Sequence, residues 1–170
     1  MQPSPDLIES FGQIVDFSAS EGLVPLDEAA RAALCTCIEQ PEQLALLKAL
    51  QNSQKPCVLT WLKTDGPITP TPEASLKLHL LSHVLTRPNS LNLAGIYAAL
   101  PNIAWTSEGP MAISALPDAM LLARVEGRHL EVTSLDKFPK LTNYVVPEGV
   151  RIADSARVRL GAYLGAGTTV

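Results

Sequence analysis

The chain ends in a segment, residues 146–170, that carries aliphatic side chains at intervals of six residues. This spacing fits neither an α-helix nor an alternating strand. The aliphatic series consists of Val146, Ile152, Val158, Leu164 and Val170. Small or medium-sized residues follow its first four members at a distance of four, at Val150, Ala156, Ala162 and Thr168. A period of six indicates hexapeptide repeats, of which three form one coil of a left-handed parallel β-helix. We therefore predict the first coil of such a solenoid here.

Two other interpretations of this segment are an irregular glycine-rich tail and a phosphate-binding loop at Gly161–Gly167. The sequence GAYLGAG has neither the glycine spacing of a dinucleotide-binding loop nor the lysine of a Walker motif. A single coil also leaves one end with unpaired backbone groups, and repeat folds need about three units for stability. We expect either that the natural protein continues beyond Val170, which we favour, or that a partner covers the coil.

The residues before this segment predict an α+β domain, made of a small helical bundle and a small α/β unit. Helical periodicity appears over residues 4–19, 25–40, 41–54, 72–87 and 92–100. Residues 115–127 fit either a helix or a strand, and we favour a helix. Strand patterns appear over 57–63, 102–107 and 129–136. We expect Pro88 to end the fourth helix and Gly127 to close the last one. The predicted organisation is a domain over 1–137, mostly helical over 1–55, then an extended connector over 138–145 and the β-helix over 146–170.

Charge and hydropathy exclude several classes of function. The net charge is −4 and the isoelectric point is near 5.3, which argues against a nucleic-acid-binding protein. No apolar run reaches the roughly 20 residues of a membrane span. The first residues carry no basic segment, so we predict no signal peptide and a cytoplasmic protein.

The chain has three cysteines. Cys35, Cys37 and Cys57 fit no zinc spacing, and we expect three reduced, structural thiols.

Other residues that often carry chemistry have simpler interpretations. His79 and His83 have the spacing of two metal ligands on a helix, but no glutamate lies between them and no third ligand is evident. We interpret them as a packed or partly exposed pair, and we interpret Trp61 and Trp105 as core residues. Asp136 and Lys137 precede a Phe-Pro pair at the predicted domain junction, where they would orient the connector.

Two long stretches closely resemble a known enzyme family, tetrahydrodipicolinate N-succinyltransferase in its longer pseudomonad and actinobacterial form. These stretches are LKLHLLSHVLTRPNSLNLAGIYAALPNIAWT at 76–106 and EVTSLDKFPKLTNYVVPEGVRIADSARVRLGAYLGAGTTV at 131–170. Asn143 stands before Tyr144 where the family pattern has aspartate. The resemblance is good over 56–170 and loose over the first 55 residues.

The resemblance implies a specific reaction and assembly. The family moves succinyl from succinyl-CoA to the amino group of ring-opened tetrahydrodipicolinate in lysine biosynthesis, and it works as a homotrimer. Its catalytic glutamate and most coenzyme A contacts lie beyond the position that matches Val170, so we predict no catalytic residue, no cofactor bound by this chain, and no activity of this chain alone. Some relatives bind magnesium through an aspartate where this chain has Ala156, so we expect no metal there.

The acceptor of this reaction is a dicarboxylate and coenzyme A is polyanionic, so guanidinium groups are the expected binding groups. The tail offers Arg151, Arg157 and Arg159. Arg159 follows an inward aliphatic residue and so faces outward, where a groove between subunits would lie, and we predict it as a substrate-binding residue. The alternative interpretation is that each arginine is a solvated surface residue of the solenoid without a binding role. Alternative functions are a non-catalytic module that caps and trimerises a β-helix, and a hexapeptide acyltransferase with another acceptor.

Overall fold

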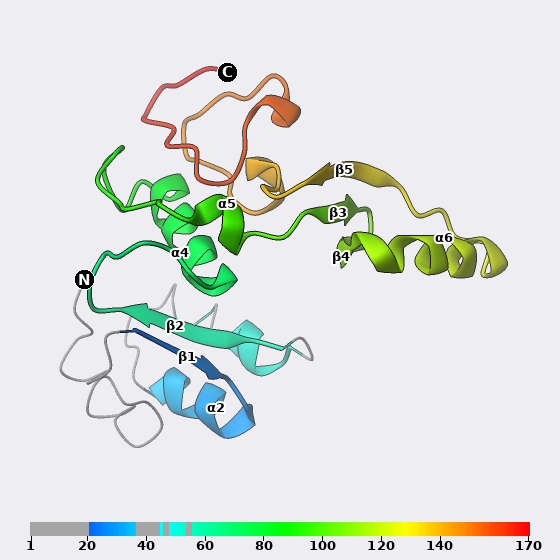
Figure 1. The fold of residues 1–170 in the computed structure, drawn as a ribbon, viewed down its shortest axis with the longest axis horizontal. Coiled ribbons are helices and arrows are strands. Elements are labelled where there is room, and N and C mark those ends of the chain that lie inside the picture. The colour runs from blue at the N-terminus through cyan, green and yellow to red at the C-terminus, as the bar shows by residue number, and fades with distance from the viewer. Residues whose placement is uncertain (1–20, 37–44, 46–47, 54–55) are drawn as a thin grey trace. The chain divides into compact units, whose positions relative to one another are not determined.

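A computed structural model of the chain describes residues 21–36, 45, 48–53 and 56–170 (Figure 1). The chain divides into two compact units, Met1–Gly66 and Pro67–Val170. The helix predicted over residues 4–19 lies outside the described residues. No described helix has the length and apolar character needed to cross a membrane. The domain boundaries predicted at 137/138 and 145/146 stay a prediction.

The first unit contains a two-stranded antiparallel sheet and a helix. Strand β1, Glu21–Pro25, pairs with β2, Val58–Leu62, and helix α2 spans Glu28–Thr36. Asp27 caps α2, because its carboxylate accepts a hydrogen bond from the backbone N–H of Ala30 at 2.7 Å. The Arg31 guanidinium donates to the carbonyls of Leu50 and Ser53, at 3.1 and 2.6 Å, and so ties residues 48–53 to α2. Strand β2 and helix α2 agree with the predictions, whereas β1 was not predicted and the helical bundle is not confirmed.

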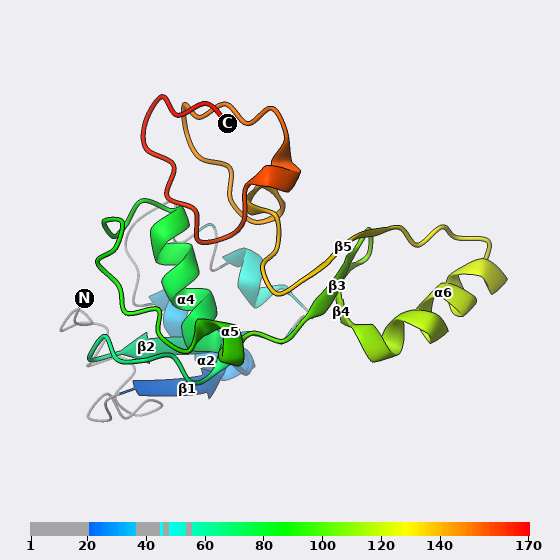
Figure 2. The ribbon, with the colours of Figure 1, turned by 45° about the horizontal axis from the view of Figure 1, so that its top comes forward.

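The second unit begins with two helices and continues into a three-stranded sheet. Helix α4 spans Thr71–Ser82 and α5 spans Ile96–Ala99. The antiparallel sheet has the order β4-β3-β5, with β3 at Ile103–Thr106, β4 at Gly109–Ala112 and β5 at Val132–Asp136. A 3₁₀ turn, Ile113–Ala115, leads into helix α6, Leu116–Val125, which returns the chain to β5 (Figures 1 and 2). All of these elements except β4 and the turn were predicted, and α6 closes before Gly127 as expected.

Helix α4 ends earlier than predicted, and the reason is local. It stops at Ser82 rather than at Arg87, because Val84 takes a left-handed conformation with φ of 59°. The N–H of Val84 donates to the carbonyl of Leu81 at 3.0 Å, and the N–H of Leu85 donates to that of Leu80 at 2.9 Å. These two bonds form a Schellman motif, which satisfies the last carbonyls of the helix. A β-branched residue is strained in this conformation, so a valine here does not indicate the end of a helix.

The hydrophobic core of the second unit joins its beginning to its end. Its buried members are Ile68, Ala74, Leu78, Ile96, Leu100, Leu141, Val145, Val158, Leu160 and Leu164. Leu141 is completely buried and lies in a 3₁₀ turn, Leu141–Asn143, so the connector is not simply extended as predicted. The side chain of Ser82 accepts a hydrogen bond from the backbone N–H of Gly161 at 2.7 Å, which fixes the end of α4 to the tail.

The tail packs on this core largely with the predicted side chains. Val158 and Leu164 are buried, and Ile152 and Val170 pack against the core cluster. Val146 is 84% exposed, so its predicted inward position is wrong, and its neighbour Val145 is buried instead. The 3₁₀ turn Leu141–Asn143 lies just before this point, and the N–H of Val145 donates to the Leu141 carbonyl at 2.7 Å, which ties Val145 to the buried Leu141.

The last residues of the tail return beside its first half. Arg151 pairs in parallel with Thr169, three hexapeptides further along the chain. Its N–H donates to the carbonyl of Thr168 and its carbonyl accepts from the N–H of Val170, both at 3.0 Å. The N–H of Ala153 also donates to the carbonyl of Val170, at 2.8 Å.

Candidate functional site

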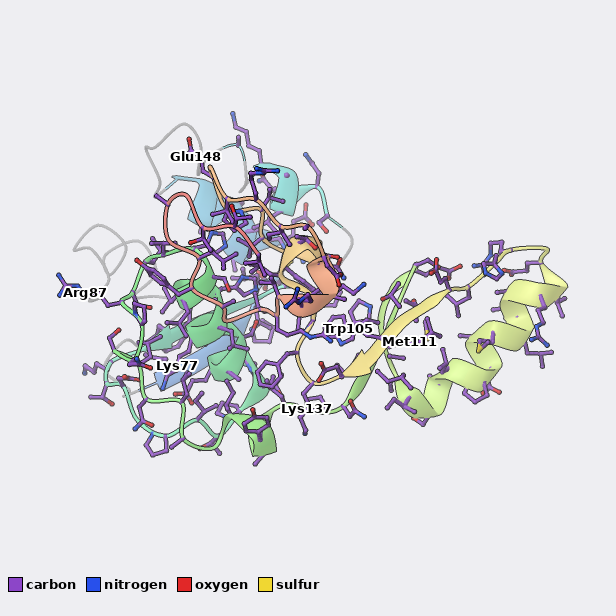
Figure 3. All side chains as sticks on the ribbon, turned by 90° about the horizontal axis from the view of Figure 1, so that it is seen from above. Lys77, Arg87, Trp105, Met111, Lys137 and Glu148 are labelled. Carbon is purple, nitrogen blue, oxygen red and sulfur yellow. The ribbon has the colours of Figure 1, made fainter. Side chains whose placement is uncertain are left out.

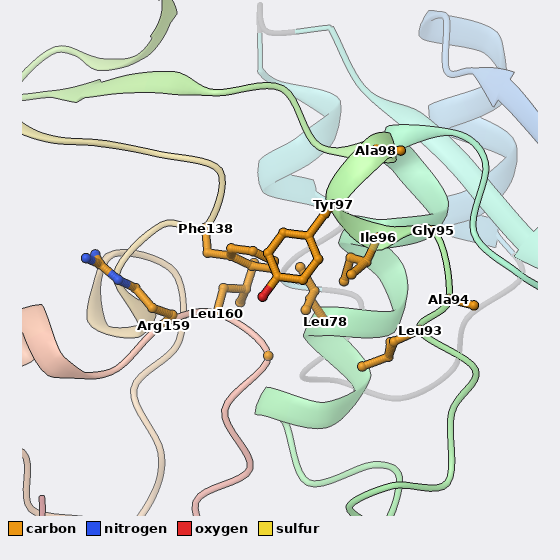
Figure 4. A pocket seen from close by; sticks show the side chains of 11 residues that line it. Leu78, Leu93, Ala94, Gly95, Ile96, Tyr97, Ala98, Phe138, Arg159 and Leu160 are labelled. Atoms are coloured by element: carbon orange, nitrogen blue, oxygen red, sulfur yellow. The ribbon is translucent and has the colours of Figure 1, made fainter.

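A cleft of about 850 Å³ opens on the second unit between α4, the segment 93–98, Phe138 and the segment 159–161 (Figure 4). Most of its wall is apolar, with Leu78 from α4 and Leu160 from the tail facing it. The ring of Tyr97 packs edge-on against that of Phe138, with ring centroids 5.6 Å apart and an angle of 76°. These residues are far apart in the sequence, so sequence patterns gave no signal for the cleft.

Two glycines allow the backbone to approach closely at the cleft. Gly95 has φ of 87°, and a Cβ atom there would overlap the carbonyl oxygen of Ile68. Gly161 has φ of 99°, and a Cβ atom there would overlap the Leu78 side chain. Both positions combine a left-handed backbone with a close contact, so they favour glycine on two grounds.

The predicted substrate-binding residue Arg159 lies at the edge of this cleft. Its Nε atom is 3.4 Å from the Asp136 carboxylate, and the two side chains are 37% and 34% exposed. Its Nη1 atom is buried and has no hydrogen-bond partner among the described residues. The guanidinium points away from the apolar wall in Figure 4. Arg151 and Arg157 are exposed and do not line the cleft, so the structure does not bring the three arginines together there.

Asp136 and Lys137 connect the sheet to the rest of the unit. The Asp136 carboxylate accepts from the backbone N–H of Lys137 at 2.7 Å and faces Arg159. The Lys137 ammonium donates to the carbonyl of Leu100, at the end of α5. Trp105 of β3, labelled in Figure 3, donates from its indole to the Asp136 carbonyl at 2.9 Å. These contacts orient the chain where it leaves β5, the role predicted for both residues.

Helix α4 carries a buried ion pair that the sequence pattern does not predict. The Lys77 ammonium is 3.0 Å from the Glu73 carboxylate, and the side chains are 1% and 3% exposed. Lys77 also donates to the carbonyl of Asn92 at 2.9 Å, which holds the segment before the cleft wall against the helix. A lysine and a glutamate four residues apart are usual on the exposed face of a helix, so the spacing did not indicate burial.

His79 of α4 and His83, which caps the C-terminal end of this helix, lie beside each other. Their ring centroids are 5.8 Å apart, and the His79 ring also lies edge-on to Tyr144 at 6.3 Å. Burial, and then the neighbouring charge of His83, lower the pKa of His79. Burial raises the pKa of Tyr144, so this phenol stays protonated at neutral pH. The described part of the chain holds no group of three or more potential metal-ligating side chains.

The lowered pKa of His79 predicts a loss of stability in acid. In the unfolded chain this imidazole titrates near its usual pKa of about 6.5. Because the folded pKa is lower, the full stability is present above the pKa of the unfolded chain. It falls as the pH drops from there through the pKa of the folded chain. Urea unfolding between pH 5 and 8, followed by Trp105 fluorescence in a Trp61→Phe background, measures this. His79→Gln is expected to flatten the pH profile, and the exposed-site control His129→Gln is not. An unchanged profile in His79→Gln would contradict the assignment.

Comparison with known proteins finds relatives that are N-succinyltransferases. A relative from Pseudomonas putida is 46% identical and one from Vibrio cholerae is 41% identical; each match covers 100% of this chain and 50% of the relative. Both are named 2,3,4,5-tetrahydropyridine-2,6-dicarboxylate N-succinyltransferase. The chain therefore spans about half the length of the curated relatives it matches.

A family model and a solved structure point to the same enzymes. Residues 100–140 match the family model of the middle part of tetrahydrodipicolinate N-succinyltransferase. A crystal structure of a candidate 2,3,4,5-tetrahydropyridine-2-carboxylate N-succinyltransferase from Campylobacter jejuni superposes with a TM-score of 0.81 at 28% identity, covering 96% of this chain and 46% of that one. The particular family that this chain resembles is tetrahydrodipicolinate N-succinyltransferase, as its sequence predicts, and the match is to part of that enzyme.

Proposed function

We propose that this chain is part of an enzyme that transfers succinyl from succinyl-CoA to the amino group of ring-opened tetrahydrodipicolinate, in the diaminopimelate route to lysine. The observation that supports this is 41–47% identity along the whole chain to four relatives with this activity in their names. The proposal includes a cytoplasmic homotrimer and succinyl-CoA as co-substrate, with no other cofactor bound by this chain.

The tail is proposed to be the first coil of a left-handed parallel β-helix. Support comes from the parallel pairing of Arg151 with Thr169 at an interval of three hexapeptides, which is the length of one coil. The burial of Val158 and Leu164, which lie six residues apart, also fits an inward-facing column. Rigid walls of this kind hold binding groups in place better than loops do.

The proposed activity is tested by measuring coenzyme A release from succinyl-CoA in the presence of tetrahydrodipicolinate. By the resemblance, the catalytic glutamate lies beyond the position of Val170, so the 170-residue chain alone is expected to release none. A protein extended through the additional repeats of the relatives is expected to release coenzyme A only when the acceptor is present. Activity with a sugar or serine acceptor would favour a different hexapeptide acyltransferase. Inactivity of the extended protein with every acceptor would favour a capping and trimerising module.

Arg159 is proposed to contact an acidic substrate of the extended enzyme. It is a cation at the edge of an apolar cleft, and one of its nitrogen atoms has no partner in the described part of the chain. Arg159→Gln is expected to raise KM at least about tenfold while kcat changes less, because a binding contact is lost. Asp136→Asn is the matched control, since it removes the ion pair but keeps the guanidinium. Equal effects of the two variants on KM would mean that Arg159 acts only through Asp136.

A further inference from the structure

Two of the three histidines of the chain lie one helical turn apart where α4 ends. The backbone N–H of His83, the C-cap residue of α4, donates to the carbonyl of His79 at 2.8 Å, so His83 closes the last turn of the helix. The rings are 5.8 Å apart between centroids and inclined by 33°. Residues four apart project from the same face of a helix, so both imidazoles face the same region.

Neighbouring groups contact the His79 ring and set the backbone beside His83. The His79 ring lies edge-on to Tyr144, and Tyr144 lies edge-on to Trp105 with centroids 5.7 Å apart. The Schellman motif of Val84 and Leu85 sets the backbone on the C-terminal side of His83. Ligands that are held in advance lose less conformational freedom when they bind an ion.

The location of the pair also suits a cation. Metals bind imidazole through a neutral ring nitrogen. The C-terminal end of a helix carries a partial negative charge that favours a cation. Two imidazole nitrogens match zinc, copper and nickel rather than magnesium or calcium.

We infer that His79 and His83 together bind one transition-metal dication of the zinc, copper and nickel group, with water in the remaining positions. The described residues supply no larger group of ligands, so the site offers two protein ligands and open coordination positions. This inference departs from the prediction of a simple packed pair. It is separate from the proposed succinyl transfer, and neither depends on the other.

Calorimetric titration with Ni²⁺ alone at pH 7.5 tests this inference on the 170-residue chain. The wild type and the control His129→Gln, which changes an exposed histidine far along the chain, are expected to bind Ni²⁺ equally. His79→Gln and His83→Gln are each expected to lose one binding equivalent or at least about tenfold in affinity. Binding by the wild type is expected to weaken at pH 5.5, where protons compete for the imidazoles.

Two results would overturn the inference. One is Ni²⁺ binding by both histidine variants that equals that of the wild type. The other is no uptake by the wild type at millimolar Ni²⁺. Thermal melting checks that each variant is folded, and if His79→Gln does not fold, the exposed residue His83 decides the outcome by itself.

Discussion

Replacing Lys77 with methionine is expected to lower the free energy of unfolding of the second unit by about 3–5 kcal/mol. The substitution keeps most of the side-chain volume but leaves the Glu73 carboxylate without its partner, in a place where only 3% of that side chain is exposed. The hydrogen bond from Lys77 to the Asn92 carbonyl is lost as well. Urea unfolding followed by Trp105 fluorescence in the Trp61→Phe background measures the change.

The matched control is the double variant Glu73→Gln/Lys77→Met, which removes both charges. It is expected to recover most of the loss, because the dominant cost in the single variant is an uncompensated buried charge. The glutamine can still accept from the backbone N–H of Thr69, which lies 3.4 Å from the Glu73 carboxylate. Equal stability of the single and double variants would show that the ion pair is not buried in solution.

Replacing Gly95 with alanine is expected to cost about 3 kcal/mol of stability and to distort the cleft. The left-handed backbone at φ of 87° accounts for roughly 1–2 kcal/mol of this. The remainder arises because the new Cβ overlaps the Ile68 carbonyl oxygen, a backbone atom that cannot move independently. The N–H of Ile68 donates to the Ala94 carbonyl at 2.7 Å. A movement of the Ile68 backbone away from the new Cβ would therefore break this hydrogen bond.

Gly149→Ala is the control for this prediction. Gly149 has φ of 67°, and a Cβ atom there would meet nothing within 4 Å. The control therefore carries the backbone cost alone, roughly 1–2 kcal/mol. The same urea unfolding experiment compares the two variants. If Gly95→Ala is no more destabilised than Gly149→Ala, the close approach to Ile68 does not exist.

The elements that could be predicted from the sequence are those with a strong local pattern. Helices α4 and α6 show helical periodicity, and strands β2, β3 and β5 are rich in β-branched and aromatic residues. Strands β1 and β4, with the sequences EGLVP and GPMA, contain glycine and proline and show no such pattern. They are strands because a partner strand lies beside them, and single-sequence patterns do not reveal a partner.

The candidate site could be predicted only in part, for a similar reason. The outward position of Arg159 is predicted because this residue follows an inward aliphatic residue of the six-residue series, which is a local pattern. Its partner Asp136, and the cleft wall of Leu78 and Phe138, come from distant parts of the chain. The Lys77–Glu73 pair was missed because burial is a tertiary property that spacing does not report.

The core that joins α4 to the tail has a consequence for the synthesis of the protein. Leu78 near the start of the second unit packs in the same cluster as Val158 and Leu164 near its end. A nascent chain that has emerged from the ribosome only as far as the sheet therefore lacks the residues that cover α4. Such long-range closure slows folding and leaves apolar surface exposed to aggregation during translation. The unit can acquire its native packing only after its final residues have left the exit tunnel.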